Sequence, residues 1–365
     1  MKIPTTLSEL TPSWLTEALQ TTEGLADVEV ELCEVEPMGV GQGLSSQMGR
    51  LRLTYAEGAA GPATIIAKLP PSDAASRATA SRLNLFEIEN RFYAELAPRA
   101  GLRVPRCYYG AMNRPADEHV LLLEDLAGSV VGDDVAGSSL ARVELVVRHL
   151  AGMHAAWWES PQLAELAWLK SWSDPAEAET MESLYQTSWD TVEGYGFEIP
   201  PAVVDLGRSL KPCSAAIHRE LSAPPWTLVH GDVRLDNLLF GTAEAAPPLV
   251  VIDWQIVGRL RGAYDVATFL VSSLKPEIRG LCELDLVAAY HRALLAGGVA
   301  DYSLDACLTD YRLTMVSWFS RVVFVGASYD LGNERGHALI QGLLDRVSAA
   351  LVDLDCGKLI GEAGR

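Results

Sequence analysis

The character of the chain changes near residue 125, and this change is the strongest constraint on its fold. Before that point, strand-like segments surround a Gly-rich turn and one long helical segment. After it, apolar residues recur at helical spacing over most of the remaining length. The 365 residues suit two lobes at roughly 150 residues per domain. We expect a strand-rich first lobe, residues 1–125, and a mostly helical second lobe, residues 126–365.

The first lobe holds five segments with the pattern of β-strands. Alternating apolar and polar residues, or a short apolar run bounded by turn residues, mark each of them. Thr11 and Pro12 predict the start of an N-terminal helix, because Thr caps helices well and Pro is tolerated in the first turn. A helix over 74–96 is expected between the third and fourth strands. The predicted strands cover 28–32, 48–55, 64–69, 104–109 and 119–123.

The charge of the chain excludes some partners. It carries 48 acidic and 29 basic residues, a formal net charge of −19. No basic run offers the counter-charge that a nucleic-acid duplex needs, so nucleic acid is not an expected partner. No segment reaches the ~18–20 uncharged apolar residues of a membrane span, and the N-terminus lacks the apolar core of a signal peptide. We expect a cytoplasmic protein that binds no membrane, with six cysteines that show neither metal-site nor disulfide spacing.

Three oxygen-bearing side chains follow short apolar runs of the second lobe. Asn237 lies five residues after Asp232, and Asp253 lies sixteen residues after Asn237. The runs 226–229 and 248–252 place these side chains at strand ends. One carboxylate can face a hydroxyl group while an amide oxygen and a second carboxylate hold Mg²⁺, which prefers hard oxygen ligands. Each residue alone is typical of turns, but this order is that of protein kinases.

These motifs resemble those of the aminoglycoside phosphotransferase and choline kinase superfamily of protein-kinase-like enzymes. The chain looks closest to the bacterial branch that is similar to ecdysteroid kinases, over about residues 38–269. The resemblance implies a bilobal, protein-kinase-like α+β fold. Its N-lobe would hold a five-stranded antiparallel sheet with one long helix, and its C-lobe would be larger and mostly helical. It also implies an enzyme that uses ATP and Mg²⁺ to phosphorylate a hydroxyl group of a small molecule.

The resemblance assigns nucleotide binding to the N-lobe. Lys68 resembles the lysine that binds the phosphates, and Glu89 resembles the helix carboxylate that orients this lysine. Glu87 is the rival for that role. It lies two residues before Glu89, so it points to a different face of the same helix. Main-chain groups of Glu124 and Leu126 would contact the adenine. The loop over the phosphates would consist of Gly41, Gln42, Gly43, Ser45 and Ser46.

The resemblance assigns the chemistry to the C-lobe. Asp232 would orient the acceptor hydroxyl, and Asn237 and Asp253 would bind Mg²⁺. Arg234 is expected to stabilise the γ-phosphoryl group, because its planar fork of donors suits phosphate oxygens. The alternative is that Arg234 pairs with a neighbouring carboxylate such as Asp236.

Residues near these motifs are expected to be structural. Asp265 resembles a buried carboxylate that braces the backbone of the catalytic loop. We expect His154, on an apolar helix, to be a hydrogen-bonded core residue, and His230 to lie under the loop.

The sequence leaves alternatives open for the identity of the acceptor and for the activity of the protein. An aminoglycoside or amino sugar, a choline-like alcohol and a steroid-like alcohol all stay open. Residues 171–207 hold eight acidic residues and no Lys or Arg, which suits a cationic acceptor, whereas a solvated acidic face is the other interpretation. A catalytically silent nucleotide-binding module is a second possibility. A protein kinase is disfavoured, because only eleven residues lie between Asp253 and Asp265 and Gly231 replaces the arginine of those enzymes.

Overall fold

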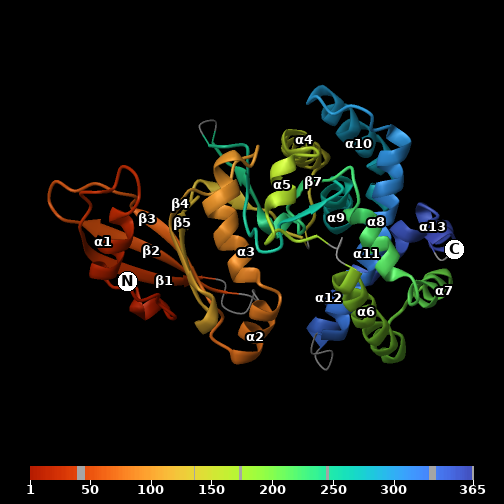
Figure 1. The fold of residues 1–365 in the computed structure, drawn as a ribbon, viewed down its shortest axis with the longest axis horizontal. Helices are drawn as coiled ribbons and strands as arrows, with labels where there is room; N and C mark the ends of the chain where they lie inside the picture. The colour runs from red at the N-terminus through yellow and green to blue at the C-terminus, as the bar shows by residue number, and fades with distance from the viewer. Residues whose placement is uncertain (39–45, 135, 172–174, 244–245, 329–333, 364–365) are drawn as a thin grey trace. The chain divides into compact units, whose positions relative to one another are not determined.

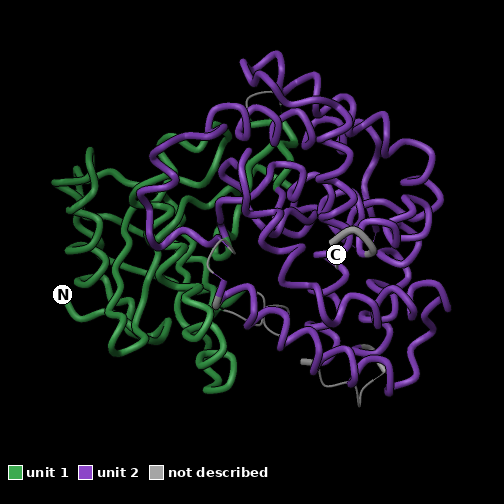
Figure 2. Tube along the Cα trace, turned by 45° about the vertical axis from the view of Figure 1, so that its right-hand side comes forward, with its two compact units in different colours: residues 1–130, 239–256 green, residues 131–238, 257–365 purple. Residues whose placement is uncertain are grey.

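The chain forms two compact units. The computed structural model describes residues 1–365 except 39–45, 135, 172–174, 244–245, 329–333 and 364–365. Unit 1 contains residues 1–130 and 239–256, and unit 2 contains residues 131–238 and 257–365 (Figure 2). The predicted division at residue 125 lies close to the first boundary. It does not include the second segment of unit 1.

Unit 1 is built on a five-stranded antiparallel sheet with the strand order β1-β2-β3-β5-β4 (Figure 1). Each predicted strand of the first lobe overlaps one observed strand, so this part of the predicted fold is confirmed. The strands are β1 Val30–Met38, β2 Gln47–Tyr55, β3 Thr64–Leu69, β4 Cys107–Asn113 and β5 Glu118–Glu124.

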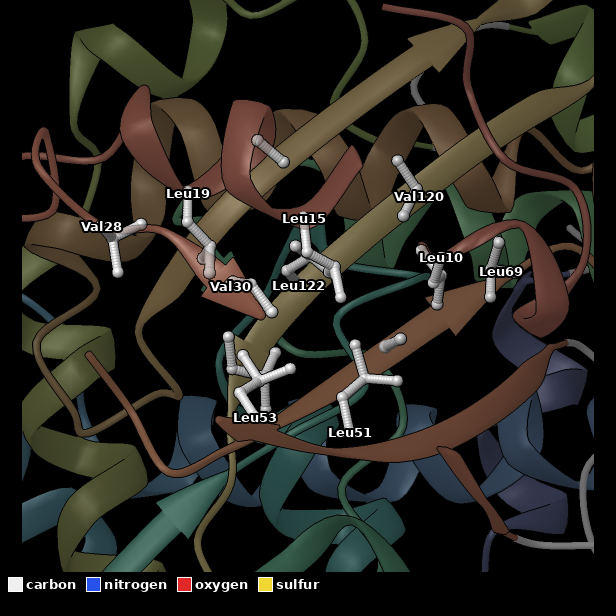
Figure 3. Packing of buried hydrophobic residues seen from close by; sticks show 13 residues of the cluster. Leu10, Leu15, Leu19, Val28, Val30, Leu51, Leu53, Leu69, Val120 and Leu122 are labelled. Atoms are coloured by element: carbon white, nitrogen blue, oxygen red, sulfur yellow. The ribbon is translucent and has the colours of Figure 1, made fainter. Parts of the chain in front are cut away.

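Helix α1, Pro12–Gln20, covers one face of this sheet. Its predicted cap is present, because the Thr11 hydroxyl accepts a hydrogen bond from the Trp14 N–H at 3.3 Å. Leu15 and Leu19 of α1 are fully buried and point toward strand residues such as Leu53 (Figure 3). This cluster is the apolar core on that side of the sheet.

Strand β3 carries residues to both faces of the sheet. Ala67 and Leu69 belong to the core under α1. Lys68 lies between them in sequence, so its side chain points to the opposite face. Helix α3, Leu85–Arg91, meets Lys68 on that face through Glu89.

The prediction of one long helix over 74–96 is wrong. Helix α2 covers Ala74–Arg82 and stops before α3, and a π-helical turn over Phe92–Leu96 follows α3. Asn84, between α2 and α3, has φ 55°, in the left-handed region that Asn tolerates better than most residues. Its side-chain oxygen accepts a hydrogen bond from Arg114 at 3.1 Å. A contact this far along the chain leaves no mark in the local helical pattern.

Unit 2 is mostly helical in its described part, as predicted. Helix α11 contacts α6, α8, α9, α10 and α12. A short antiparallel pair consists of β7 Thr227–Val229 and β10 Gly258–Leu260, and the loop that carries Asp232 follows β7. The helices are α4 Leu140–Trp157, α5 Pro161–Glu165, α6 Pro175–Tyr195, α7 Pro201–Leu210, α8 Ser214–Ser222, α9 Ala263–Ser273, α10 Pro276–Ala296, α11 Leu304–Ser328, α12 Glu334–Asp353 and α13 Gly357–Ala363.

A small sheet explains why residues 239–256 belong to unit 1. It consists of β6 Ser129–Val131, β8 Leu238–Gly241 and β9 Leu249–Val251. The Val251 N–H also donates to the Arg103 carbonyl at 3.0 Å. Across the residues described, no helix has the length and apolar character of a membrane span.

Candidate active site

Lys68 is a buried lysine that two carboxylates of unit 1 share. Its Nζ lies 2.8 Å from Glu89 Oε1 and 2.8 Å from Asp253 Oδ1. The side chains of Lys68 and Glu89 are 8% and 1% exposed, and that of Asp253 is 30% exposed. Burial by itself lowers the pKa of Lys68, but the charges of Asp253 and Glu89 outweigh it and raise this pKa above its usual value. Lys68 is therefore charged at any physiological pH.

Glu89, and not Glu87, is the helix carboxylate that contacts Lys68. Burial raises the pKa of Glu89, and the charge of Lys68 offsets part of this effect. Glu87 forms ion pairs with Arg91 at 3.0 Å and with Arg114 at 3.1 Å. The two glutamates thus serve different surfaces of α3, in line with their positions on the helix.

The segment around Asp253 is fixed by its neighbour Trp254. Asp253 adopts the left-handed conformation, with φ 66°. Trp254 is fully buried and stacks on Phe92, with ring centroids 4.0 Å apart and planes 6° apart. Its indole N–H donates to the Val251 carbonyl at 3.1 Å. The stack ties the Asp253 loop to the chain directly after α3, which carries Glu89.

The other predicted nucleotide residues are only partly described. Ser46 Oγ accepts a hydrogen bond from Gln255 Nε2 at 3.3 Å. Glu124 is the last residue of β5 and lies two residues before Leu126. Its carboxylate forms an ion pair with Arg103 at 2.6 Å. The adenine contact of Glu124 and Leu126 stays a prediction. The remaining loop residues lie outside the described part of the chain: Gly41, Gln42, Gly43 and Ser45.

Asp232 of unit 2 is a carboxylate with donors at both oxygens. Arg321 Nη2 donates to its Oδ1 at 2.8 Å, and Asn237 Nδ2 donates to its Oδ2 at 3.3 Å. Arg234 Nε lies 3.5 Å from the same Oδ2. The side chain is 19% exposed, so Asp232 is oriented by its partners while it remains accessible.

Asn237 is oriented by the backbone of the same loop. Its Nδ2 donates to the Asp232 carbonyl at 3.0 Å as well as to the Asp232 carboxylate. This hydrogen-bond pattern assigns the NH₂ group to the side of Asp232 and directs the amide oxygen away from it. An amide oxygen is a ligand type that Mg²⁺ accepts.

Asp265 braces the backbone of the loop that carries Asp232, as predicted. Gly231 has φ 84°, a conformation that glycine adopts without strain. The fully buried Asp265 accepts hydrogen bonds from the N–H groups of His230 at 2.7 Å and Gly231 at 2.9 Å. His154 bonds to Asp265 at 3.2 Å and to Tyr290 at 2.8 Å, which confirms it as a satisfied core histidine. These contacts hold the backbone from which Asp232 projects.

Arg234 is surrounded by carboxylates in the structure. Its Nη1 lies 2.8 Å from Asp236 Oδ2 and 3.1 Å from Asp134 Oδ2. Burial lowers the pKa of Arg234, and the charges of Asp232, Asp134 and Asp236 more than reverse this effect. The arrangement is the alternative raised by the sequence, in which Arg234 pairs with Asp236.

Arg321 on α11 is the site residue that the sequence did not reveal. In the sequence it only interrupts the apolar run 315–329. In the structure its Nη1 donates to the Gly231 carbonyl and its Nη2 to Asp232, both at 2.8 Å. Its guanidinium also lies 5.0 Å from the centre of the Trp318 ring. An arginine within an apolar helix signals a partner, but the pattern does not say which one.

The two predicted magnesium ligands lie in different units, Asp253 in unit 1 and Asn237 in unit 2. Within the described ranges, no group of three or more His, Cys, Asp or Glu could hold a metal ion. Mg²⁺ bound with nucleotide needs few protein ligands, because phosphates and waters complete its coordination. The carboxylate of Asp253 and the amide oxygen of Asn237 are each of a ligand type that Mg²⁺ accepts, and their role as metal ligands stays a prediction.

Solved structures share this fold. A candidate aminoglycoside phosphotransferase from Ralstonia eutropha JMP134 matches at 17% identity and a TM-score of 0.59, over 94% of this chain and 98% of its own. A choline kinase from Cryptosporidium parvum Iowa II matches at 12% identity and a TM-score of 0.57, over 97% of this chain and 100% of its own. The GDP complex of a mutant aminoglycoside 2′-phosphotransferase matches at 13% identity and a TM-score of 0.57, over 94% of this chain and 99% of its own. The fold is therefore that of the small-molecule kinases, as predicted.

The sequence itself gives the family. The sequence profile of the ecdysteroid kinase-like family matches residues 40–297. The chain belongs to the ecdysteroid kinase-like family, and the predicted resemblance is confirmed. No curated protein matches the sequence.

Proposed function

We propose that the protein transfers the γ-phosphoryl group of ATP to a hydroxyl group of a small-molecule alcohol. The observation that carries this proposal is the position of Lys68, 2.8 Å from both Glu89 and Asp253. A lysine ion-paired in this way is typical of enzymes that bind the phosphates of ATP for phosphoryl transfer. Membership of the ecdysteroid kinase-like family and the shared fold with choline and aminoglycoside kinases support the same reaction class.

In this proposal unit 1 binds the nucleotide. The ammonium of Lys68 binds the α and β phosphates, and Glu89 keeps it in place. Ser46 and the glycine loop before it cover the phosphates, and main-chain groups of Glu124 and Leu126 contact the adenine. Because the transition state of phosphoryl transfer is loose, positioning and charge neutralisation supply most of the catalysis.

In this proposal unit 2 prepares the acceptor. Asp232 orients the acceptor hydroxyl and accepts its proton late in the reaction. Arg234, which pairs with Asp134 and Asp236 beside Asp232, is the proposed donor to the γ-phosphoryl group. Asn237 and Asp253 are the proposed Mg²⁺ ligands. When bound, Mg²⁺ neutralises charge on the phosphates.

The test measures ADP release from MgATP with a panel of alcohols, sugars and aminoglycosides. We expect at least one acceptor to stimulate ADP release. The variant Asp232→Ala should reduce this turnover at least ~100-fold and leave MgATP affinity within about twofold of wild type. Asp305→Ala, an exposed residue of α11, is the control and should behave as wild type.

Two outcomes would contradict the proposal. If Asp232→Ala keeps more than ~10% of turnover, Asp232 is not the base. If MgATP binds but no acceptor stimulates ADP release, the chain is a nucleotide-binding module without kinase activity.

A further inference from the structure

Helix α10 of unit 2 carries a row of exposed leucines. Leu281 is 84% exposed, Leu284 is 52% exposed and Leu295 is 44% exposed. Together with the small Ala288 they are spaced by three, four and seven residues, which places all of them on one side of the helix. Single exposed leucines are ordinary on protein surfaces. A row with this spacing is instead the pattern of a seam between two packed helices.

The opposite side of α10 is fixed within unit 2. The helix packs against α4, α9, α11 and α12 and lies along the upper edge of these helices in Figure 1. The Tyr290 hydroxyl forms a hydrogen bond with His154 Nδ1 at 2.8 Å. His291 Nε2 lies 2.7 Å from the Tyr302 carbonyl. The row of leucines is therefore held on an ordered element, so a partner can bind it without the entropy cost of ordering a flexible segment.

Two exposed residues of opposite charge lie beside the row of leucines. In a repeat of seven residues that has Leu281 and Ala288 at its first position, Asp285 and Arg292 both take the fifth position. Residues at this position border the seam and set the partner and the orientation of paired helices through their charges. Among the described residues, neither Asp285 nor Arg292 has an ion-pair partner. Both charges are available to a second helix.

A second copy of α10 complements this pattern when it runs antiparallel to the first. Asp285 and Arg292 lie equally far on either side of the midpoint between Ala288 and Ala289. In a two-fold symmetric pair that crosses at this midpoint, Asp285 of each copy meets Arg292 of the other copy. The small side chains of the two alanines allow the helix axes to approach closely there. The surface is thus complementary to itself in both charge and shape.

We propose that the exposed side of α10 is the contact surface of a symmetric homodimer of this protein. The leucines form its apolar centre, and the ion pairs between Asp285 and Arg292 set its antiparallel register. A membrane fits this surface less well, because membrane-surface helices carry mainly Lys and Arg beside their apolar face. The exposed charged residues of α10 are Glu277, Asp285 and Arg292. None of the residues proposed for phosphoryl transfer lies on α10, so dimerisation can be tested without a substrate.

Sedimentation equilibrium of the whole chain tests the dimer. We expect a Kd on the order of 10 µM, because one pair of helices buries less than the ~1,200 Å² of a stable interface. Leu281→Glu should raise this Kd at least about 30-fold, because each dimer then buries two unpaired charges. Leu339→Glu, which changes an exposed leucine of α12, is the matched control and should leave the Kd unchanged.

Two results would overturn the proposal. One is a wild-type protein that is still monomeric at about 200 µM. The other is a dimer whose Kd is the same in Leu281→Glu as in wild type. Thermal melting at concentrations where all the proteins are monomers separates a lost interface from a lost fold. Each variant should melt within about 2 °C of wild type there, because the side chains that change are exposed.

A charge exchange tests the antiparallel register. Asp285→Arg places like charges opposite each other in the homodimer, and Arg292→Asp does the same with the other sign. Each variant alone should therefore show a Kd at least about tenfold above wild type. A mixture of the two variants should form a heterodimer with nearly wild-type affinity, because opposite charges then meet at both positions. A mixture that stays as weakly associated as its two components would overturn the proposed surface.

Discussion

The two units treat their central charged residue in opposite ways. In unit 1 a lysine lies between two carboxylates, and in unit 2 a carboxylate lies between two arginines. Lys68 and Glu89 are almost completely buried, whereas Asp232 and Arg321 are 19% and 31% exposed. Burial makes a missing partner expensive, because an uncompensated charge is left out of water. Accessible groups can be resolvated, so a missing partner there changes orientation more than folding.

This comparison separates stability from turnover. Loss of a partner in unit 1 should destabilise the protein as well as impair nucleotide binding. Loss of a partner in unit 2 should impair phosphoryl transfer and leave the fold largely intact.

The largest expected effect is that of Lys68→Met. It leaves Glu89 and Asp253 without their cation, which should lower the free energy of unfolding by about 3–5 kcal/mol and abolish MgATP binding. Denaturant unfolding and calorimetric titration measure the two effects. Lys2→Met, whose side chain is 75% exposed in wild type, is the control and should shift stability by less than about 1 kcal/mol. A stability of Lys68→Met equal to wild type would break the comparison.

The next effect is that of Arg234→Ala on turnover. If Arg234 stabilises the γ-phosphoryl group, kcat should fall about 100-fold, as for the loss of one preorganised donor. The melting temperature should change little, because the three neighbouring carboxylates can be resolvated. A loss of less than about threefold in kcat would show that Arg234 only pairs with Asp134 and Asp236.

A smaller effect concerns acid stability. His119 of unit 1 is fully buried and stacks on Phe86, and among the described residues neither ring nitrogen has a hydrogen-bond partner. Burial lowers the pKa of His119 from 6.5 to about 3, so the unfolded chain takes up a proton below pH 6.5 that the folded protein refuses. Stability should therefore fall as pH drops from 6.5 toward 3, by about 2 kcal/mol at pH 5 from this group alone.

The variant His119→Phe should remove this part of the pH dependence. Denaturant unfolding at pH 7.5 and pH 5 measures it. His218→Phe in unit 2 is the matched comparison, because burial lowers the pKa of His218 to about 4. An equal pH dependence in wild type and His119→Phe would show that the ring gains a partner in solution.

The smallest effect is that of Asp190→Asn on α6. Its pair with Lys211 is exposed, so stability should change by less than about 1 kcal/mol and the preference among acceptors should not change. A shift of this preference toward neutral alcohols would place α6 in acceptor recognition and weaken the contrast drawn for unit 2.

Much of the fold could be predicted because its signals are local. Strands β1 to β5 follow from alternation and turn residues, and Lys68 on the third of them could be assigned because it resembles the phosphate-binding lysine of the family. Glu89 could be preferred over Glu87 because its surroundings resemble the family's motif, and helix geometry showed only that the two lie on different faces. Asp232, Asn237 and Asp253 are close enough in sequence for their spacing to carry information.

Other features depend on contacts between distant residues. Arg321 lies on α11, 89 residues after Asp232, and nothing in its neighbourhood names its partner. Asn84, at the break between α2 and α3, accepts a hydrogen bond from Arg114, and residues 239–256 contact the rest of unit 1 through the sheet of β6, β8 and β9 and the Val251–Arg103 hydrogen bond. Pairings of this kind are set by tertiary structure, which local propensity does not encode.

The stack of Trp254 on Phe92 has a consequence for inhibitor design. An inhibitor that works by swinging this indole outward would first have to expose a large aromatic surface, at a cost of about 4–6 kcal/mol. That amounts to a loss of roughly a thousandfold or more in affinity before any new contact forms. Compounds that bind with Trp254 in its buried position do not incur this free-energy cost.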